Sequence, residues 1–278
     1  MSDVPHSDEP KSLGDFAPPA DTPEPAPATL RAKAAVTGIS TLHRLGYALG
    51  AALVAGFLAW GIGEKTYGYY QIPASVLGQR DFSALNREER IADQKNTAIA
   101  YGTFGALLGL LSGVAGGAFV RSIPGGASAA LAGLVLGGVG GALASYALAP
   151  IFDRFYSDEA GSLLVTILFR GGICAVVGMT AGLALGWGWQ GPRGIPRVLT
   201  GGLAGSVCGI IAFEVFNAVL FPADRNDAII PTSTLARLLA YLFVSVGAAI
   251  GAVLAGRQRS LPAGRKPQSQ SKPIISLE

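Results

Sequence analysis

Three ionisable residues lie inside long apolar runs of this sequence, where a charge needs an explanation. The run GIIAFEVFNAVLFP, residues 209–222, contains Glu214, and two neighbouring runs contain Arg170 and Arg237. Asn217 follows Glu214 by three residues and shares its face if the run is helical. A carboxylate beside guanidinium groups could bind a solute, relay protons, or form an ion pair that joins helices. Which of these applies depends on the elements that position the four residues.

The composition indicates that those elements are transmembrane helices. Half of the 278 residues are hydrophobic and only 14% are charged, against a usual charged share of about 25%. Apolar runs occupy residues 45–63, 97–120, 126–149, 162–186, 196–221 and 234–256. Each approaches or exceeds the about 20 residues that cross a hydrocarbon core, and none alternates as a barrel strand does. We therefore predict an all-α polytopic bundle of six transmembrane helices over residues 42–256.

Three further segments lie outside the predicted spans. Residues 1–41 are rich in Pro, Ala and acids, and residues 257–278 are basic and contain Pro. Both lack the apolar pattern that a folded core requires, which predicts two disordered tails. A loop of residues 64–96 joins the first two spans. Its FSALNREERIADQK stretch, residues 82–95, mixes charges at helical spacing, which predicts a solvated helix leading into the second span.

The basic residues predict that both termini are cytoplasmic. With the N-terminus inside, 12 of the 21 Lys and Arg residues lie in inside segments and seven in outside segments. On this topology Arg170 lies about 12 Å, and Glu214 about 10 Å, from the outer ends of their helices, at 1.5 Å per residue. Arg237 lies near the start of the sixth helix. All three charges are therefore predicted on the outer side of the bundle.

A lone charge at that depth costs several kcal/mol, so these residues should pair or face water. We expect Glu214 to pair with one or both arginines, with Asn217 joining by a hydrogen bond and Arg237 able to extend to the interface. An acid flanked by two bases keeps its charge and is a poor proton carrier. This favours an ion pair that locks three helices over a solute or proton site.

Small residues recur at a spacing of four, which keeps them on one helical face. Missing side chains there let two backbones approach closely, the arrangement called a glycine zipper. The predicted packing residues are Gly105, Gly109, Gly113, Gly117, Gly133, Gly137, Gly141, Gly178, Gly182, Gly205, Gly209, Gly247 and Gly251.

The chain also repeats itself at an offset of 72 residues, where residues 123–150 match residues 195–222 at nine positions without gaps. Helices 3–4 and 5–6 are therefore predicted to form a parallel repeat. Prolines 124, 150, 196 and 222 all fall at predicted helix ends. The broken helices typical of transporters are thus not indicated.

No familiar catalytic motif is convincing. The GWGWQG stretch at residues 186–191 fits a dinucleotide pattern literally, but it follows a predicted membrane helix instead of a strand. Phosphate-binding, metalloprotease and serine-hydrolase motifs are missing, and both cysteines, Cys174 and Cys208, lie in apolar runs. We expect no enzymatic activity, no cofactor, no metal and no nucleic-acid partner.

Three stretches of the chain resemble a group of uncharacterised bacterial multi-span membrane proteins with no assigned activity. They are NTAIAYGTFGALLGLLSGVAGG from Asn96, FEVFNAVLFP from Phe213 and PTSTLARLLA from Pro231, and the resemblance covers residues 45–256. It implies a location in the bacterial inner membrane. We therefore expect a lipid-embedded protein with a structural or assembly role, as a homo-oligomer or with a membrane-protein partner. The alternative is a small channel or transporter using Arg170, Glu214 and Arg237.

Overall fold

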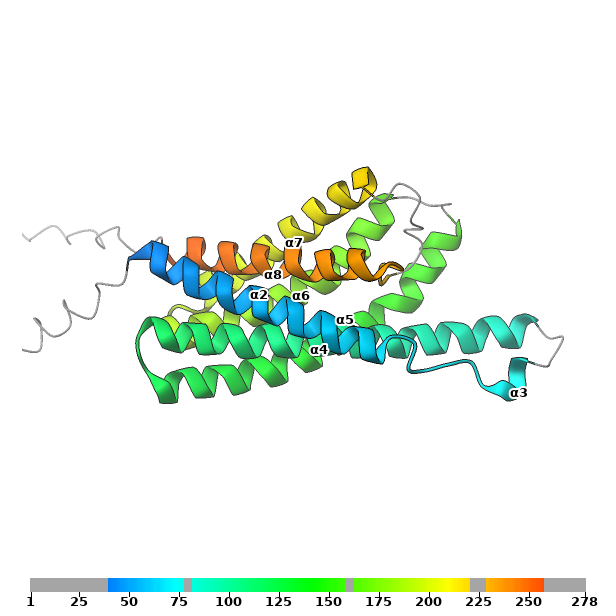
Figure 1. The fold of residues 1–278 in the computed structure, drawn as a ribbon, viewed down its shortest axis with the longest axis horizontal. Coiled ribbons are helices and arrows are strands. Elements are labelled where there is room, and N and C mark those ends of the chain that lie inside the picture. Colours follow the sequence, from blue (N-terminus) through cyan, green and yellow to red (C-terminus); the bar gives the residue numbers. More distant parts are fainter. Residues whose placement is uncertain (1–39, 78–81, 159–162, 221–228, 258–278) are drawn as a thin grey trace, which may run out of the picture. The chain divides into compact units, whose positions relative to one another are not determined.

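The computed structural model describes residues 40–77, 82–158, 163–220 and 229–257, which are helical apart from short connections (Figure 1). The helices are α2 (Thr41–Thr66), α3 (Ala74–Leu77), α4 (Phe82–Phe119), α5 (Ile123–Asp158), α6 (Leu163–Gln190), α7 (Ile195–Leu220) and α8 (Thr234–Arg257). Among the described residues, six of these helices are long and apolar enough to cross a membrane. The predicted polytopic helical bundle is therefore confirmed. The predicted tails lie almost wholly outside the described residues.

Large apolar side chains on the outer faces of the bundle fit a lipid environment. Leu131, Leu143 and Leu168 are each more than 60% exposed in the isolated chain. In water such an apolar surface would drive aggregation, whereas lipid tails solvate it. The chain is a multi-pass integral membrane protein.

Two helices extend well beyond their predicted spans. The 38 residues of α4 measure about 57 Å at 1.5 Å per residue, against a hydrocarbon core of about 30 Å. Its first 15 residues precede the predicted second span and contain the charged stretch at residues 82–95. That stretch is helical, as predicted. At the same end of the bundle, α5 continues nine residues past the predicted limit at residue 149.

Pro150 lies inside α5 and not at its end, contrary to our prediction. Proline lacks the N–H that would donate to the carbonyl four residues earlier, which is that of Tyr146. Gln94 of α4 supplies the missing donor, because its Nε2 donates to the Tyr146 carbonyl oxygen at 2.6 Å. The helix therefore continues through the proline with this carbonyl satisfied from outside.

The helices pack as two close pairs, α4 with α5 and α7 with α8, joined by α6. Helix α2 lies beside α4 and α8 (Figure 1). At the close pairs the backbones touch, so that a Cβ added at Gly105 or Gly109 would meet the backbone of α5. The contacts across the α4–α5 pair are Gly105 with Gly137, Gly109 with Gly133, Gly113 with Ala130, Gly117 with Gly126, and Gly141 with Tyr101. Across the α7–α8 pair they are Gly201 with Gly251, Gly205 with Gly247, and Gly209 with Phe243.

The two copies of the sequence repeat pack against different neighbouring helices. Gly133 of α5 contacts the preceding helix, α4, whereas Gly205, its counterpart 72 residues later, contacts the following helix, α8. In α6, Gly178 and Gly182 contact α7. Helix α7 therefore makes glycine-to-backbone contacts with both α6 and α8, whereas those of α5 are with α4 and its glycines meet α6 through side chains such as Ala184.

Candidate functional site

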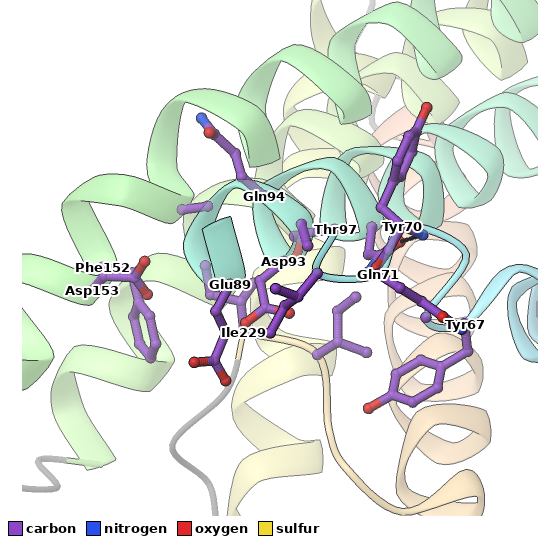
Figure 2. Close-up of a pocket in the computed structure, with 16 residues that line it drawn as sticks. Tyr67, Tyr70, Gln71, Glu89, Asp93, Gln94, Thr97, Phe152, Asp153 and Ile229 are labelled. Carbon is purple, nitrogen blue, oxygen red and sulfur yellow. Dashed lines mark hydrogen bonds between the residues drawn. The ribbon is translucent and has the colours of Figure 1, made fainter. Parts of the chain in front are cut away.

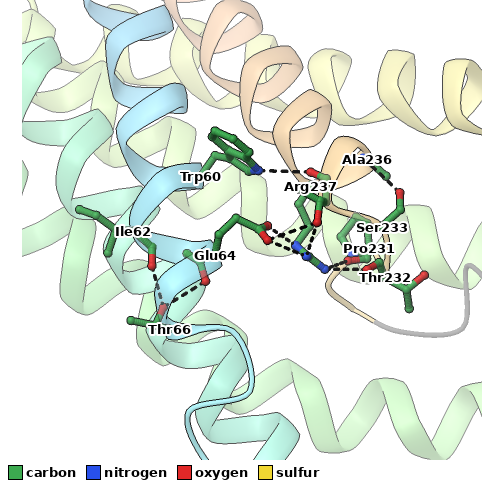
Figure 3. Close-up of polar contacts among 11 residues, drawn as sticks. Trp60, Ile62, Glu64, Thr66, Pro231, Thr232, Ser233, Ala236 and Arg237 are labelled. Carbon is green, nitrogen blue, oxygen red and sulfur yellow. Dashed lines mark hydrogen bonds and ion pairs between the residues drawn. The ribbon is translucent and has the colours of Figure 1, made fainter.

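The predicted polar cluster divides into two separate ion pairs. Arg170 Nη1 lies 2.6 Å from Glu214 Oε1, and the two side chains are 1% and 0% exposed. Arg237 does not join them, since its Nε lies 2.6 Å from Oε1 of Glu64 (Figure 3). Asn217 is buried on α7, three residues after Glu214. Glu214, expected to pair with one or both arginines, pairs with Arg170.

Sequence reasoning missed Glu64 because the first span was predicted to end at residue 63. Helix α2 continues to Thr66 and packs against α8, which brings Glu64 to Arg237. The contact is bidentate, since Arg237 Nη2 also donates to Oε2 of Glu64 at 3.0 Å. The guanidinium carbon lies 4.0 Å from the ring centroid of Tyr67. The only sequence signal for this partner is an acid directly after the end of an apolar run.

Both buried arginines also donate to the same short stretch of backbone, residues 229–232, which leads into α8. Arg170 Nε donates to the carbonyl of Ile229 at 3.0 Å. Arg237 Nη1 donates to the carbonyls of Pro231 at 3.0 Å and Thr232 at 2.7 Å (Figure 3). The arginines of both ion pairs therefore hydrogen-bond to the backbone of residues 229–232, which directly precede α8.

Ile229 and Ile230 of this stretch line a cleft of ≈ 660 Å³, which we call the polar cleft (Figure 2). The extended parts of α4 and α5 and the segment after α2 complete it. Its lining includes Tyr67, Tyr70, Gln71, Glu89, Ala92, Asp93, Gln94, Asn96, Thr97, Ala149, Phe152, Asp153, Ile229 and Ile230. No sequence pattern predicts this cleft, because four segments that are distant in the chain contribute to it.

Hydrogen bonds fix the segment after α2 against α4. The backbone N–H of Tyr70 donates to Oδ1 of Asn96 at 3.0 Å, and Nδ2 of Asn96 donates to the Tyr70 carbonyl at 3.0 Å. The lining around this contact includes the carboxylates of Glu89, Asp93 and Asp153. In Figure 2 these three lie toward one end of the cleft and the tyrosines toward the other. Within the described part of the chain, no group of His, Cys, Asp and Glu is arranged to hold a metal ion.

The Arg170–Glu214 pair is enclosed by protein, whereas Glu64 of the second pair is 25% exposed. Two small cavities adjoin Arg237, each of ≈ 10 Å³. A cavity of about this size holds one water molecule at most. Neither of these two cavities can hold a solute.

A second large hollow, the apolar groove, runs between α7 and α8 and measures ≈ 660 Å³. Its lining is almost entirely apolar and includes Ala204, Cys208, Ala212, Leu242 and Val246. Cys208 is exposed and Cys174 is buried. This groove faces the lipid.

No protein family, curated protein or solved structure matches the chain. The functional argument therefore rests on the geometry of these sites.

Proposed function

We propose that the chain is a non-enzymatic structural or assembly protein of the bacterial cytoplasmic membrane, with both termini inside. The observation that carries this proposal is the burial of the Arg170–Glu214 ion pair, with side chains 1% and 0% exposed. A solute or proton site needs access to water, whereas an ion pair that joins helices does not. Arg170 and Glu214 join α6 to α7, and the glycine contacts hold the neighbouring helices together.

The transport alternative receives less support from the geometry. Pro150 lies within a helix, as in many transporters. The Tyr146 carbonyl that this proline leaves free is satisfied by Gln94, however, so the helix is not broken there. The cavities beside Arg237 are of one-water size.

Flux measurements on proteoliposomes separate the two functions. We expect the wild-type protein and Glu214→Gln to show the same flux of ions and small solutes as empty liposomes. A solute flux that the wild type supports and that Glu214→Gln abolishes, at unchanged thermal stability, would overturn the structural proposal.

The apolar groove is the surface we propose for assembly, with a transmembrane helix of a second copy as its occupant. Ala204, Cys208 and Ala212 are exposed and spaced by four, so a second helix can approach them closely. Symmetric pairing of identical surfaces is the commonest form of association between identical chains. In such a pair, the two Cys208 thiols face one another across the interface.

Copper-phenanthroline oxidation in native membranes tests this surface without altering the protein. The chain has two cysteines, and Cys174 is buried. We expect a disulfide-linked dimer that disappears in Cys208→Ser and persists in Cys174→Ser. A protein that is not cross-linked and remains monomeric in lipid nanodiscs would refute assembly through the groove.

A further inference from the structure

We propose that the polar cleft binds a linear organic polyamine, a molecule with two or more ammonium groups separated by short hydrocarbon chains. This binding site is independent of the structural role proposed above. It follows from the charge, the shape and the hydrogen-bonding capacity of the cleft.

The charges that the described residues contribute to the cleft are all negative. These residues include Glu89, Asp93 and Asp153, and no Lys or Arg. Among the described residues none of the three forms a salt bridge, unlike Glu64 and Glu214, each of which has an arginine partner. Arg90 acts on Asp153 through space, but Asp93 is subject to repulsion from both Glu89 and Asp153. A cation in the cleft relieves that repulsion.

Cations of the protein lie at the rim and not within. Arg90 lines the neighbouring pocket with Asp153. The Lys95 ammonium lies 5.2 Å from the ring centroid of Tyr70. Neither belongs to the lining of the cleft itself, so its space is open to an external cation.

A hydroxyl in the cleft wall points independently to a polar ligand. The Thr97 side chain is more than nine-tenths buried, at 5% exposed, and lines the cleft (Figure 2). Its hydroxyl makes no hydrogen bond to a described side chain or carbonyl, whereas those of Thr66 and Thr180 do so on their own helices. Its oxygen is not one of the fully enclosed atoms without a partner, so it is reached from the cleft. A ligand ammonium group, with up to three N–H donors, can donate to this oxygen.

The arrangement of the carboxylates favours separated charges over a single ion. The three acids do not converge on one point that could hold a metal, as the described residues show. Apolar side chains, among them Ala92, Ala149, Ile229 and Ile230, lie between the polar groups of the lining. The methylene segments of a polyamine can contact these side chains while its ammonium groups reach the carboxylates and Thr97. A volume of ≈ 660 Å³ is ample for such a molecule.

Calorimetry with spermidine tests the proposal on the full-length protein in phosphatidylcholine nanodiscs, whose neutral lipid does not itself attract polyamines. We expect saturable one-to-one binding in 150 mM NaCl. The double variant Glu89→Gln/Asp93→Asn should bind at least tenfold more weakly, and Thr97→Val several-fold more weakly. Glu88→Gln removes an acid of the same helix that does not line the cleft, and should bind as the wild type does. Equimolar Mg²⁺ should not displace spermidine.

Each contrary outcome counts against the cleft. If the wild type does not bind spermidine at millimolar concentration, the proposal is wrong. It is also wrong if Glu88→Gln weakens spermidine binding as much as the double variant does, because that result would indicate diffuse electrostatic attraction. Displacement by equimolar Mg²⁺ would replace the polyamine with an inorganic cation. Thermal denaturation of every variant in the same nanodiscs distinguishes lost binding from lost folding.

Discussion

Replacing Glu214 with glutamine should destabilise the bundle strongly. The substitution keeps the shape of the side chain but leaves the Arg170 guanidinium, 1% exposed, without its carboxylate 2.6 Å away. Removing one partner of a buried ion pair costs about 3–5 kcal/mol. At about 2–4 °C per kcal/mol for a protein of this size, the thermal midpoint should fall by roughly 6–20 °C.

A double-mutant cycle measures the coupling directly. The single substitutions of the cycle, Arg170→Met and Glu214→Leu, should each be costly, since one leaves the Glu214 carboxylate and the other the Arg170 guanidinium buried without its partner. Replacing both residues, as Arg170→Met/Glu214→Leu, removes both charges and should recover much of the loss. Recovery will be incomplete, because Arg170 also donates to the Ile229 carbonyl. The control is Glu88→Gln on the solvated part of α4, which should shift the midpoint by about 2 °C or less.

The assay is thermal unfolding of the wild type and all five variants in one detergent, monitored by light scattering and tryptophan fluorescence. Two results contradict the reasoning. One is a Glu214→Gln midpoint as close to the wild type as that of the control. The other is strict additivity of the two single substitutions, which would mean that the side chains do not interact.

Three further predictions concern the helix contacts, the second ion pair and the topology. Gly137→Ala should cost about 1–3 kcal/mol through overpacking against α4, whereas Gly50→Ala, with no atom within 4 Å of the added carbon, should be neutral in the same thermal assay; equal effects would refute the contact. Glu64→Gln should speed amide hydrogen exchange in residues 229–232, because Arg237 loses its carboxylate; unchanged exchange would show that the pair does not order this segment. In a cysteine-free background, Ser75→Cys should react with a membrane-impermeant maleimide from outside and Ser122→Cys only after lysis; the reverse pattern would invert the predicted topology.

The spans were predictable because transfer of apolar side chains into lipid dominates the energetics of a membrane helix. That criterion finds where a helix can cross, and it does not find where the helix ends. The first 15 residues of α4 are charged and therefore gave no hydropathy signal, although their charge spacing indicated a helix. Pro150 was placed at a helix end because a local rule cannot include Gln94, 56 positions earlier, whose side chain bonds the free carbonyl.

For the polar residues, the sequence likewise shows which side chains need partners but not which partners they have. The cost of a buried charge indicates that Arg170, Glu214 and Arg237 need partners. The similar predicted depths of Arg170 and Glu214 indicated that these two could pair with each other. The partner of Arg237 depends on how α2 packs against α8, which no sequence pattern determines. The polar cleft depends on four segments at once and on helix extensions that lie outside the apolar runs.

The two ion pairs connect the interior of the membrane bundle to the polar cleft. Arg170 on α6 and Arg237 on α8 both donate to residues 229–232, and Ile229 and Ile230 from that segment line the cleft. Tyr101 of α4 adds a third donor, since its hydroxyl donates to the Ile229 carbonyl at 3.3 Å. Moving this wall would leave buried guanidinium donors without acceptors, which is costly in a low-dielectric interior. The intramembrane charges were first considered as a possible solute or proton site. In the structure, their arginines instead hold in place the backbone that forms one wall of the polar cleft.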